Sequence, residues 1–437
     1  MAQANFVNAD DKTAVEIADS VSQGRQSAEQ VCAEHLTKIA KTDADIDAWA
    51  WHDPDTALAQ AGKIEAGLPL SSVPVGLKDI IDSRDMPCCL GSALFAGRQP
   101  DTDAVLVEKL RAAGALIMGK TRTTEFAYLQ KCETRNPHNS RFSPGGSSSG
   151  SAAAVAAGQI TLAIGSQTGG SVIRPAAYCG VYGFKPSFEA ISRAGVLQTS
   201  QTLDHIGIFA RHLGDIARLG DVVMTQDAGL ETAYHQCETA SPHFLWVEGM
   251  FADDIEDYMS ARISQLASQL GSHAEQIDLC AFLDELQQAH SIIYDYEYAQ
   301  NIGPMVAGKL DRVSAFTAQT VARGAQVSEA DYHSAMHIRQ QGIDRFAALL
   351  SGGKFLLMAS ATGQAPLFEE GTGNPACSKF TSLCGLPAIT LPHLDGLDLS
   401  GPDGLPLGVQ LVGAPSQDAS VISAAGWLAG QCSKMMR

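Results

Sequence analysis

Short apolar runs alternate along this chain with stretches of helical spacing. Each run is bounded by glycine, proline or a helix-like stretch, which is typical of buried strands. The runs lie at 73–77, 115–119, 160–165, 355–359, 387–392 and 407–413. Apolar residues at helical spacing behind Ser27 predict a helix over 27–40. The alternation predicts an α/β fold with a large, mostly parallel or mixed central sheet covered by helices on both faces.

The pattern changes between residues 215 and 350, where helical spacing dominates. Further helical patterns run through 282–300 and 328–350. One helical stripe there consists of Ile255, Met259, Ile263, Leu266 and Leu270. We therefore expect a single domain over 1–437, with a catalytic sheet core formed by 60–213 and 351–437. Residues 215–350 would form a helical insertion on the substrate side.

Charge and cysteine content narrow the function classes. The 437 residues carry 30 Lys and Arg against 48 Asp and Glu, a net charge of −18. This balance argues against a surface that coats nucleic acid or binds anionic membranes. The ten cysteines and twelve histidines show no metal-ligand spacing, and the first residues resemble no signal peptide. We expect a cytoplasmic monomer or homodimer with a small-molecule substrate, no nucleic-acid or membrane partner, and no metal or other cofactor.

The segment 143–171 carries the candidate chemistry, since 20 of its 29 residues are Gly, Ser or Ala. Apolar positions interrupt it, which favours an ordered site over a flexible linker. Within it, Gly146 to Gly150 matches a nucleophile-elbow motif with Ser148 as the nucleophile. The polar, proline-containing stretch before this motif does not suit the central strand that an elbow needs. No Gly-Lys-Ser/Thr follows for a phosphate loop.

Two Gly-Ser clusters and an isolated lysine make a better site. Gly145-Gly146-Ser147-Ser148 and Gly169-Gly170-Ser171 lie downstream of Lys78, which ends an apolar run. Together with Arg174-Pro175-Ala176 and Gly183-Phe184-Lys185-Pro186-Ser187, they resemble the signature block of the amidase signature family, the Ser-Ser-Lys amidohydrolases. The resemblance is specific over 75–210 and thin over 215–350.

The resemblance implies a role for each residue of the block. Ser171 attacks the substrate carbonyl, and its proton passes through Ser147, which follows a cis peptide bond, to Lys78. Burial would have to lower the lysine pKa for this relay to work. The backbone N–H groups of the segment Thr168-Gly169-Gly170-Ser171 would form the oxyanion hole. The residues expected to support this site structurally are Gly146, Gln167 and Asp204.

Two departures from the commonest family pattern bear on the substrate. Ser166-Gln167 stands where many members have Thr-Asp, and Arg174 lies three residues after Ser171 rather than two. This run is similar to that of the malonamidase-type bacterial amidases, in which the arginine binds a substrate carboxylate. Arg174 is therefore either a substrate anchor or a residue that orders its loop. Two interpretations remain for four side chains of the helical region: they form an aromatic roof over the pocket, or they pack in the helix core. These side chains are Tyr294, Tyr296, Tyr298 and Met305.

The sequence thus predicts an amidohydrolase that cleaves a C–N acyl bond of a small linear amide. The substrate could be a simple amide, a half-amide of a diacid, an anilide, or a carbamate (urethane). The alternative is the ammonia-releasing amidase subunit of a tRNA-dependent amidotransferase, and a third possibility is an inactive binding scaffold. We expect the histidines to be structural or solvent-facing.

Overall fold

The computed structural model, which describes residues 12–239 and 241–435, is built on one sheet of eleven strands in this part of the chain. From edge to edge the strands are β1 (Trp49–Trp51), β3 (Leu116–Thr121), β2 (Pro74–Lys78), β4 (Leu162–Gln167), β6 (His205–Ala210), β5 (Tyr182–Lys185), β10 (Ala388–Leu391), β11 (Val409–Val412), β9 (Lys354–Ala359), β7 (His243–Val247) and β8 (Ala274–Ile277). Strand β2 pairs parallel with β3 and β4, and β7 pairs parallel with β8 and β9. The other pairs are antiparallel, so the sheet is mixed.

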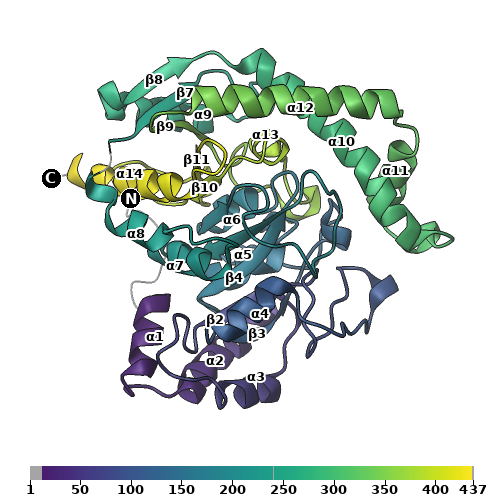
Figure 1. Cartoon of the computed structure of the whole chain (residues 1–437), viewed down its shortest axis with the longest axis vertical. Coiled ribbons are helices and arrows are strands. Elements are labelled where there is room, and N and C mark those ends of the chain that lie inside the picture. The colour runs from purple at the N-terminus through teal and green to yellow at the C-terminus, as the bar shows by residue number, and fades with distance from the viewer. Residues whose placement is uncertain (1–11, 240, 436–437) are drawn as a thin grey trace.

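Figure 1 shows helices along the length of this sheet, with the edge strand β8 at the rim of the molecule. They are α1 (Ala14–Ser22), α2 (Ala28–Ile46), α3 (Pro54–Ala61), α4 (Val105–Ala112), α5 (Ser149–Ala156), α6 (Ile173–Cys179), α7 (Leu213–Val223), α8 (Leu230–His235), α9 (Asp257–Leu270), α10 (Cys280–Val306), α11 (Ala315–Gly324), α12 (Glu329–Leu349), α13 (Lys379–Leu383) and α14 (Asp418–Met435). The predicted Ser27 cap begins α2, where its side chain accepts a hydrogen bond from the backbone N–H of Gln30.

Around β4, the two faces of the sheet bury different hydrophobic clusters, because side chains alternate along the strand. In β4, Leu162 and Ile164 belong to a cluster that includes residues of α1, α4, α7 and α14. The residue between them, Ala163, belongs to a second cluster with residues of α2, α3, α5 and α6. Helices therefore cover both faces, and the predicted α/β fold class is confirmed.

The region expected to be a helical insertion, 215–350, also contains two strands. Strands β7 and β8 extend the sheet at one end. Helix α9 lies between them in the chain, and α10 to α12 follow β8. Strand β8 lies at the edge and its residues are largely exposed, so no apolar run marks it in the sequence. The sheet therefore extends beyond the expected ranges 60–213 and 351–437. It includes β7 and β8 of the helical region and β1, which precedes residue 60.

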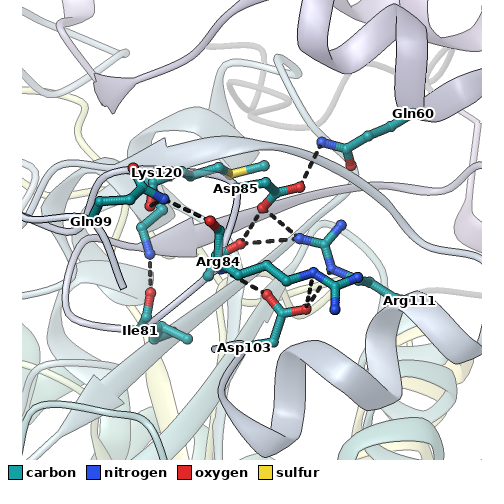
Figure 2. A network of polar contacts seen from close by, with 10 residues as sticks. Gln60, Ile81, Arg84, Asp85, Gln99, Asp103, Arg111 and Lys120 are labelled. Carbon is teal, nitrogen blue, oxygen red and sulfur yellow. Dashed lines mark hydrogen bonds and ion pairs between the residues drawn. The ribbon is translucent and has the colours of Figure 1, made fainter. Parts of the chain in front are cut away.

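A charged network fixes the segment that follows β2. Arg111 of α4 pairs with Asp85 at 2.6 Å and with Asp103 at 3.1 Å, and Lys120 of β3 donates to the backbone carbonyl of Ile81 (Figure 2). These contacts tie the segment to the elements on either side of it. The carboxyl end of β2 is thereby held in place.

Candidate active site

Lys78 ends β2 and is fully buried. Val75 and Leu77 of β2 face the first cluster, so Lys78 points to the opposite face, where α5 lies. Its Nζ donates to Ser147 Oγ at 2.6 Å and to Ser166 Oγ at 2.8 Å. The structure therefore brings together the lysine and the bridging serine that are 69 residues apart in the sequence.

Burial controls the protonation of this lysine. Desolvation lowers the pKa of Lys78 to about 7, against the opposing charge of Asp204, which raises it. A substantial fraction of the amine is therefore uncharged at neutral pH. An uncharged amine has a lone pair, so Lys78 can accept a proton from a hydroxyl next to it.

Ser147 lies just before α5, and the Gly146–Ser147 peptide bond is cis, as the family resemblance implied. Small residues let α5 approach the neighbouring backbone very closely. A side-chain carbon on Gly150 would lie 2.2 Å from the carbonyl oxygen of Ala48 and 2.5 Å from the backbone nitrogen of Arg122. The Gly-Ser-Ala composition of this segment thus serves close packing, which holds Ser147 against the end of β2.

Ser148, the nucleophile of the elbow interpretation, is fully buried. Its hydroxyl donates to the carbonyl of Ser166 at 3.1 Å and accepts from the backbone N–H of Ser166 at 3.2 Å. Both contacts attach it to β4. Ser148 therefore has a structural place, and the elbow interpretation does not fit the geometry.

The segment Thr168-Gly169-Gly170-Ser171 connects β4 to α6 and is braced from both sides. Gln167 Oε1 accepts hydrogen bonds from the backbone N–H groups of Val172 and Ile173 at 2.9 and 3.1 Å. Asp204 accepts from Thr168 Oγ1 at 2.6 Å. In the described part of the chain, the backbone N–H groups of residues 169–171 donate no hydrogen bond to a protein group. Consecutive free N–H groups on a braced loop can receive a developing negative charge.

A cavity of about 370 Å³ opens beside this loop, a volume suited to a small molecule. Gly169, Gly170 and Ser171 form part of its wall, and Ser171 is partly exposed there. Within the residues that the structure describes, no hydrogen bond joins Ser171 to Ser147. The structure thus assembles the Lys78–Ser147 half of the predicted relay and puts Ser171 on the cavity wall.

Arg174 also borders the cavity and is only 2% exposed. Its Nη2 donates to the carbonyl of Gly146 at 2.6 Å and to Thr372 Oγ1 at 3.4 Å. Its Nε and Nη1 have no hydrogen-bond partner among the described residues. The side chain therefore orders the loop before Ser147 and still has donors free for a ligand, so both roles considered for it remain compatible with its position.

Helix α10 supplies the opposite wall of the cavity. Tyr294 lies there and stacks on Tyr128, with 5.1 Å between the ring centroids. Tyr298 is fully buried, and Tyr296 stacks on Tyr332 instead. The predicted aromatic roof thus reduces to Tyr294 among the three tyrosines of α10.

His290 of α10 is a site residue that the sequence analysis assigned to structure or solvent. Its Nε2 donates to the backbone carbonyl of Thr168 at 2.8 Å, because a carbonyl can only accept. Burial lowers the pKa of His290 to about 3, so the ring is neutral. Its Nδ1 has no partner among the described residues, and the ring borders the cavity. A lone histidine in a helical pattern gives no sequence signal that it will contact this loop and border the cavity.

Helix α10 is also linked to the braced loop indirectly, through the segment that holds Asp204. Glu297 is fully buried and accepts hydrogen bonds from Ser200 Oγ, from the backbone N–H of Thr202 at 3.1 Å and from the hydroxyl of Tyr332 at 2.7 Å. Ser200 in turn donates its backbone N–H to Asp204 at 2.9 Å. The helical region is thereby connected to the same loop that Asp204 supports.

Neither a metal centre nor a membrane span is recognisable in the described ranges. No three His, Cys, Asp or Glu side chains of residues 12–239 and 241–435 are grouped to hold a metal ion. No helix in this part of the chain has the length and apolar character needed to cross a bilayer.

Comparison with known proteins identifies the family. The model of the family described as Amidase matches residues 30–422. A subunit of the glutamyl-tRNA(Gln) amidotransferase from Acidothermus cellulolyticus is 31% identical, and the alignment covers 92% of this chain and 90% of that protein. Among solved structures, that of a vestigial protein complex related to the origins of an s-triazine catabolic enzyme has a TM-score of 0.88, 28% identity and coverage of 96% and 98%. The structure of 6-aminohexanoate cyclic dimer hydrolase with substrate has a TM-score of 0.85, 26% identity and 98% coverage of both chains.

These relatives do not include a malonamidase, so that finer resemblance stays a prediction. The family itself is shown, because its model spans most of the chain. The protein belongs to the amidase family and is a hydrolase of C–N bonds other than peptide bonds.

Proposed function

We propose that this amidase releases ammonia from the carboxamide of a small amide through an acyl-enzyme on Ser171. Ser147 and Lys78 serve as the proton relay. The observation that carries the proposal is the 2.6 Å hydrogen bond between Lys78 and Ser147, and the position of Ser171 on a cavity wall supports it. The lowered pKa of Lys78 supports its role as the final proton acceptor.

In the first half of the reaction, Ser171 Oγ forms a bond to the carbonyl carbon. Its proton moves to Ser147 Oγ as the Ser147 proton moves to the neutral amine of Lys78. The oxyanion accepts hydrogen bonds from the free N–H groups of residues 169–171. The C–N bond then breaks, and Ser147 returns a proton to the departing nitrogen while Lys78 reprotonates Ser147. The products of this half are ammonia and an ester of Ser171.

In the second half, water takes the place of the nitrogen. It attacks the ester carbonyl and gives its proton to Ser147, which passes one to Lys78. The ester bond breaks, the relay returns the proton to Ser171 Oγ, and a carboxylic acid leaves. The enzyme regains its starting protonation, so the cycle needs no further reactant.

The relatives favour an ammonia-releasing amidase of the amidotransferase type over the stand-alone hydrolase of small linear amides that the sequence analysis preferred. The protein from Acidothermus cellulolyticus is named as part of an amidotransferase and aligns with nearly all of this chain. We therefore propose the carboxamide of an amino acid such as glutamine as substrate, with a partner subunit that receives the ammonia.

The stand-alone hydrolase is the second candidate. It is favoured by the structural likeness to 6-aminohexanoate cyclic dimer hydrolase over the full length of both chains. The substrates that the purified chain cleaves, with and without a partner subunit, distinguish the two. Fast turnover of half-amides, anilides or carbamates without glutaminase activity would support the second candidate. Glutamine hydrolysis that rises when ATP and a partner subunit are added would support the first.

The nucleophile is tested by covalent labelling. Ser171→Ala should lose all turnover and all labelling by a fluorophosphonate, because the attacking oxygen is gone. Ser148→Ala is the matched control, since Ser148 is a neighbouring buried serine attached to β4. Labelling that persists in Ser171→Ala and disappears in Ser148→Ala would reverse the assignment.

A further inference from the structure

We propose that Lys379 binds a carboxylate of the substrate and so selects amides that carry a negative charge. The inference rests on the proposed function, because it names the substrate class of the same cavity. Lys379 is a specificity residue here, and it takes no part in the proton relay.

The position of Lys379 places a cation next to the catalytic loop. It begins α13 and is partly buried in the cavity wall. Its Cγ lies 3.8 Å from the point that a side-chain carbon on Gly169 would occupy. Arg174 Nη1 lies 3.7 Å from the corresponding point on Gly170. Two cationic side chains therefore border the two glycines that precede Ser171.

The other charges of the cavity are already compensated. Asp295 of α10 forms a two-pronged ion pair with Arg323, at 2.9 and 3.0 Å. The charge of Asp254 raises the pKa of Lys379 without an ion pair between them. The Asp254 carboxylate accepts a hydrogen bond from Asn374 at 2.7 Å. His290 is neutral.

Within the described ranges, Lys379 and Arg174 form no ion pair with a carboxylate. Among residues 12–239 and 241–435, no carboxylate forms an ion pair with either side chain. The cavity thus has two positive side chains beside the catalytic loop that form no such ion pair. A cavity with this charge distribution favours a ligand that brings a negative charge of its own.

The contacts of Lys379 leave room for a ligand. Its ammonium has three donors, and the hydrogen bond that it makes, to Ser291 Oγ, is long at 3.4 Å. Burial lowers the pKa of Lys379; the charge of Asp254 opposes this shift, and the charge of Arg174 adds to it. A bound carboxylate would offset both effects and would accept charge-assisted hydrogen bonds.

Substitution of Lys379 tests ligand binding without disturbing the catalytic loop, which substitution of Arg174 would not do. Arg174 holds the carbonyl of Gly146, so its loss would disturb Ser147 as well as any bound ligand. Lys379 forms no hydrogen bond to the catalytic loop in the described part of the chain. Its substitution should therefore change substrate choice without changing the relay.

The test compares a half-amide with a neutral amide of similar length, glutaramate with pentanamide. In Lys379→Met, kcat/KM for glutaramate should fall about 10- to 100-fold, the expected effect of losing one charge-assisted contact. For pentanamide it should stay within about 2-fold of the wild-type value, and Lys379→Arg should restore most of the glutaramate activity. Lys309→Met, at an exposed lysine after α10, is the matched control and should leave both substrates unaffected. An equal loss for both amides, or no loss for either, would overturn the inference.

A binding measurement keeps this test independent of turnover. Glutarate, which has no bond to cleave, should bind to Ser171→Ala in calorimetry about 10- to 100-fold more tightly than to the double variant Ser171→Ala, Lys379→Met. If the wild-type enzyme cleaved no amide, the proposed function would fail, and this difference would still support the carboxylate site. Equal glutarate affinity in the two proteins, or no binding to either, would refute the site whatever the outcome of the activity assays.

Discussion

Two strand ends of this molecule carry a buried lysine in nearly the same electrostatic state. Lys78 ends β2 and Lys185 ends β5, and both are fully buried. Desolvation lowers the pKa of each to about 7, with a nearby carboxylate opposing it in both places. Burial and pKa alone therefore do not distinguish the lysine that we propose as catalytic from the other one.

The hydrogen-bond partners make the difference. Lys185 donates to two backbone carbonyls, those of Pro186 at 3.1 Å and Leu386 at 2.5 Å. A carbonyl only accepts, so Lys185 contributes hydrogens and has no proton to receive from its neighbours. Lys78 contacts two hydroxyls, which can both accept and donate. A lowered pKa thus makes a lysine a base only where its partner has a proton to give.

The largest expected effect comes from removing the lysine that has hydroxyl partners. Lys78→Ala should lower kcat at least about 10³-fold, within the range for loss of a general base, while the unfolding transition stays cooperative. Steady-state kinetics and urea unfolding would measure both quantities. Near-normal turnover in Lys78→Ala would refute the proton relay and the proposed difference between Lys78 and Lys185.

The opposite outcome is expected at the other strand end. Lys185→Met should lower the free energy of unfolding by about 1–3 kcal/mol, because two buried carbonyls lose their donor. The kcat of the folded variant should stay within about 3-fold of the wild-type value. Urea unfolding and kinetics on the same sample would measure this, and a kcat as low as that of Lys78→Ala would contradict the structural role.

The pH dependence of stability sharpens the same prediction. The pKa of Lys185 is about 7 in the folded protein and near its ordinary value of 10.5 when unfolded. Between these values the unfolded chain binds a proton that the folded protein does not, so wild-type stability rises as pH increases from about 7 to 10.5. Lys185→Met lacks this contribution. Its stability deficit should therefore widen across that window.

The sequence was sufficient for the parts of the site that are encoded locally. Glycines and serines surround Ser147 and Ser171, and Lys78 ends an apolar run. These motifs resemble those of a known family, and that resemblance implied the proposed relay. The long runs of β2, β4 and β9 likewise predicted strands, because burial on both faces requires continuous apolar residues.

The sequence was insufficient where a single residue acts through a distant contact. His290 and Lys379 reach the loop at 168–171 from elements more than 100 residues away, and neither stands in a motif. Strand β8 was missed because it is a short, polar edge strand, and no apolar run marks it. Such features depend on tertiary placement, which one sequence does not reveal.

The smallest expected effect concerns Ser166, the second hydroxyl partner of the proposed catalytic lysine. Its Oγ accepts a hydrogen bond from Lys78 at 2.8 Å and so stabilises the charged form of the amine. In the wild-type enzyme, kcat/KM should rise with pH around the lysine pKa of about 7, because the neutral amine is the active form. Ser166→Ala removes that acceptor, so the pKa of Lys78 should fall and the midpoint should move to lower pH.

The rate of Ser166→Ala above its midpoint should drop only modestly, about 10-fold, since Ser147 remains as the proton donor. Profiles of kcat/KM between about pH 5 and 9 would measure the midpoint and the plateau together. A midpoint that stays in place or moves to higher pH would show that Ser166 does not act on the charged lysine. In that case the difference between the two buried lysines would depend on Ser147 alone.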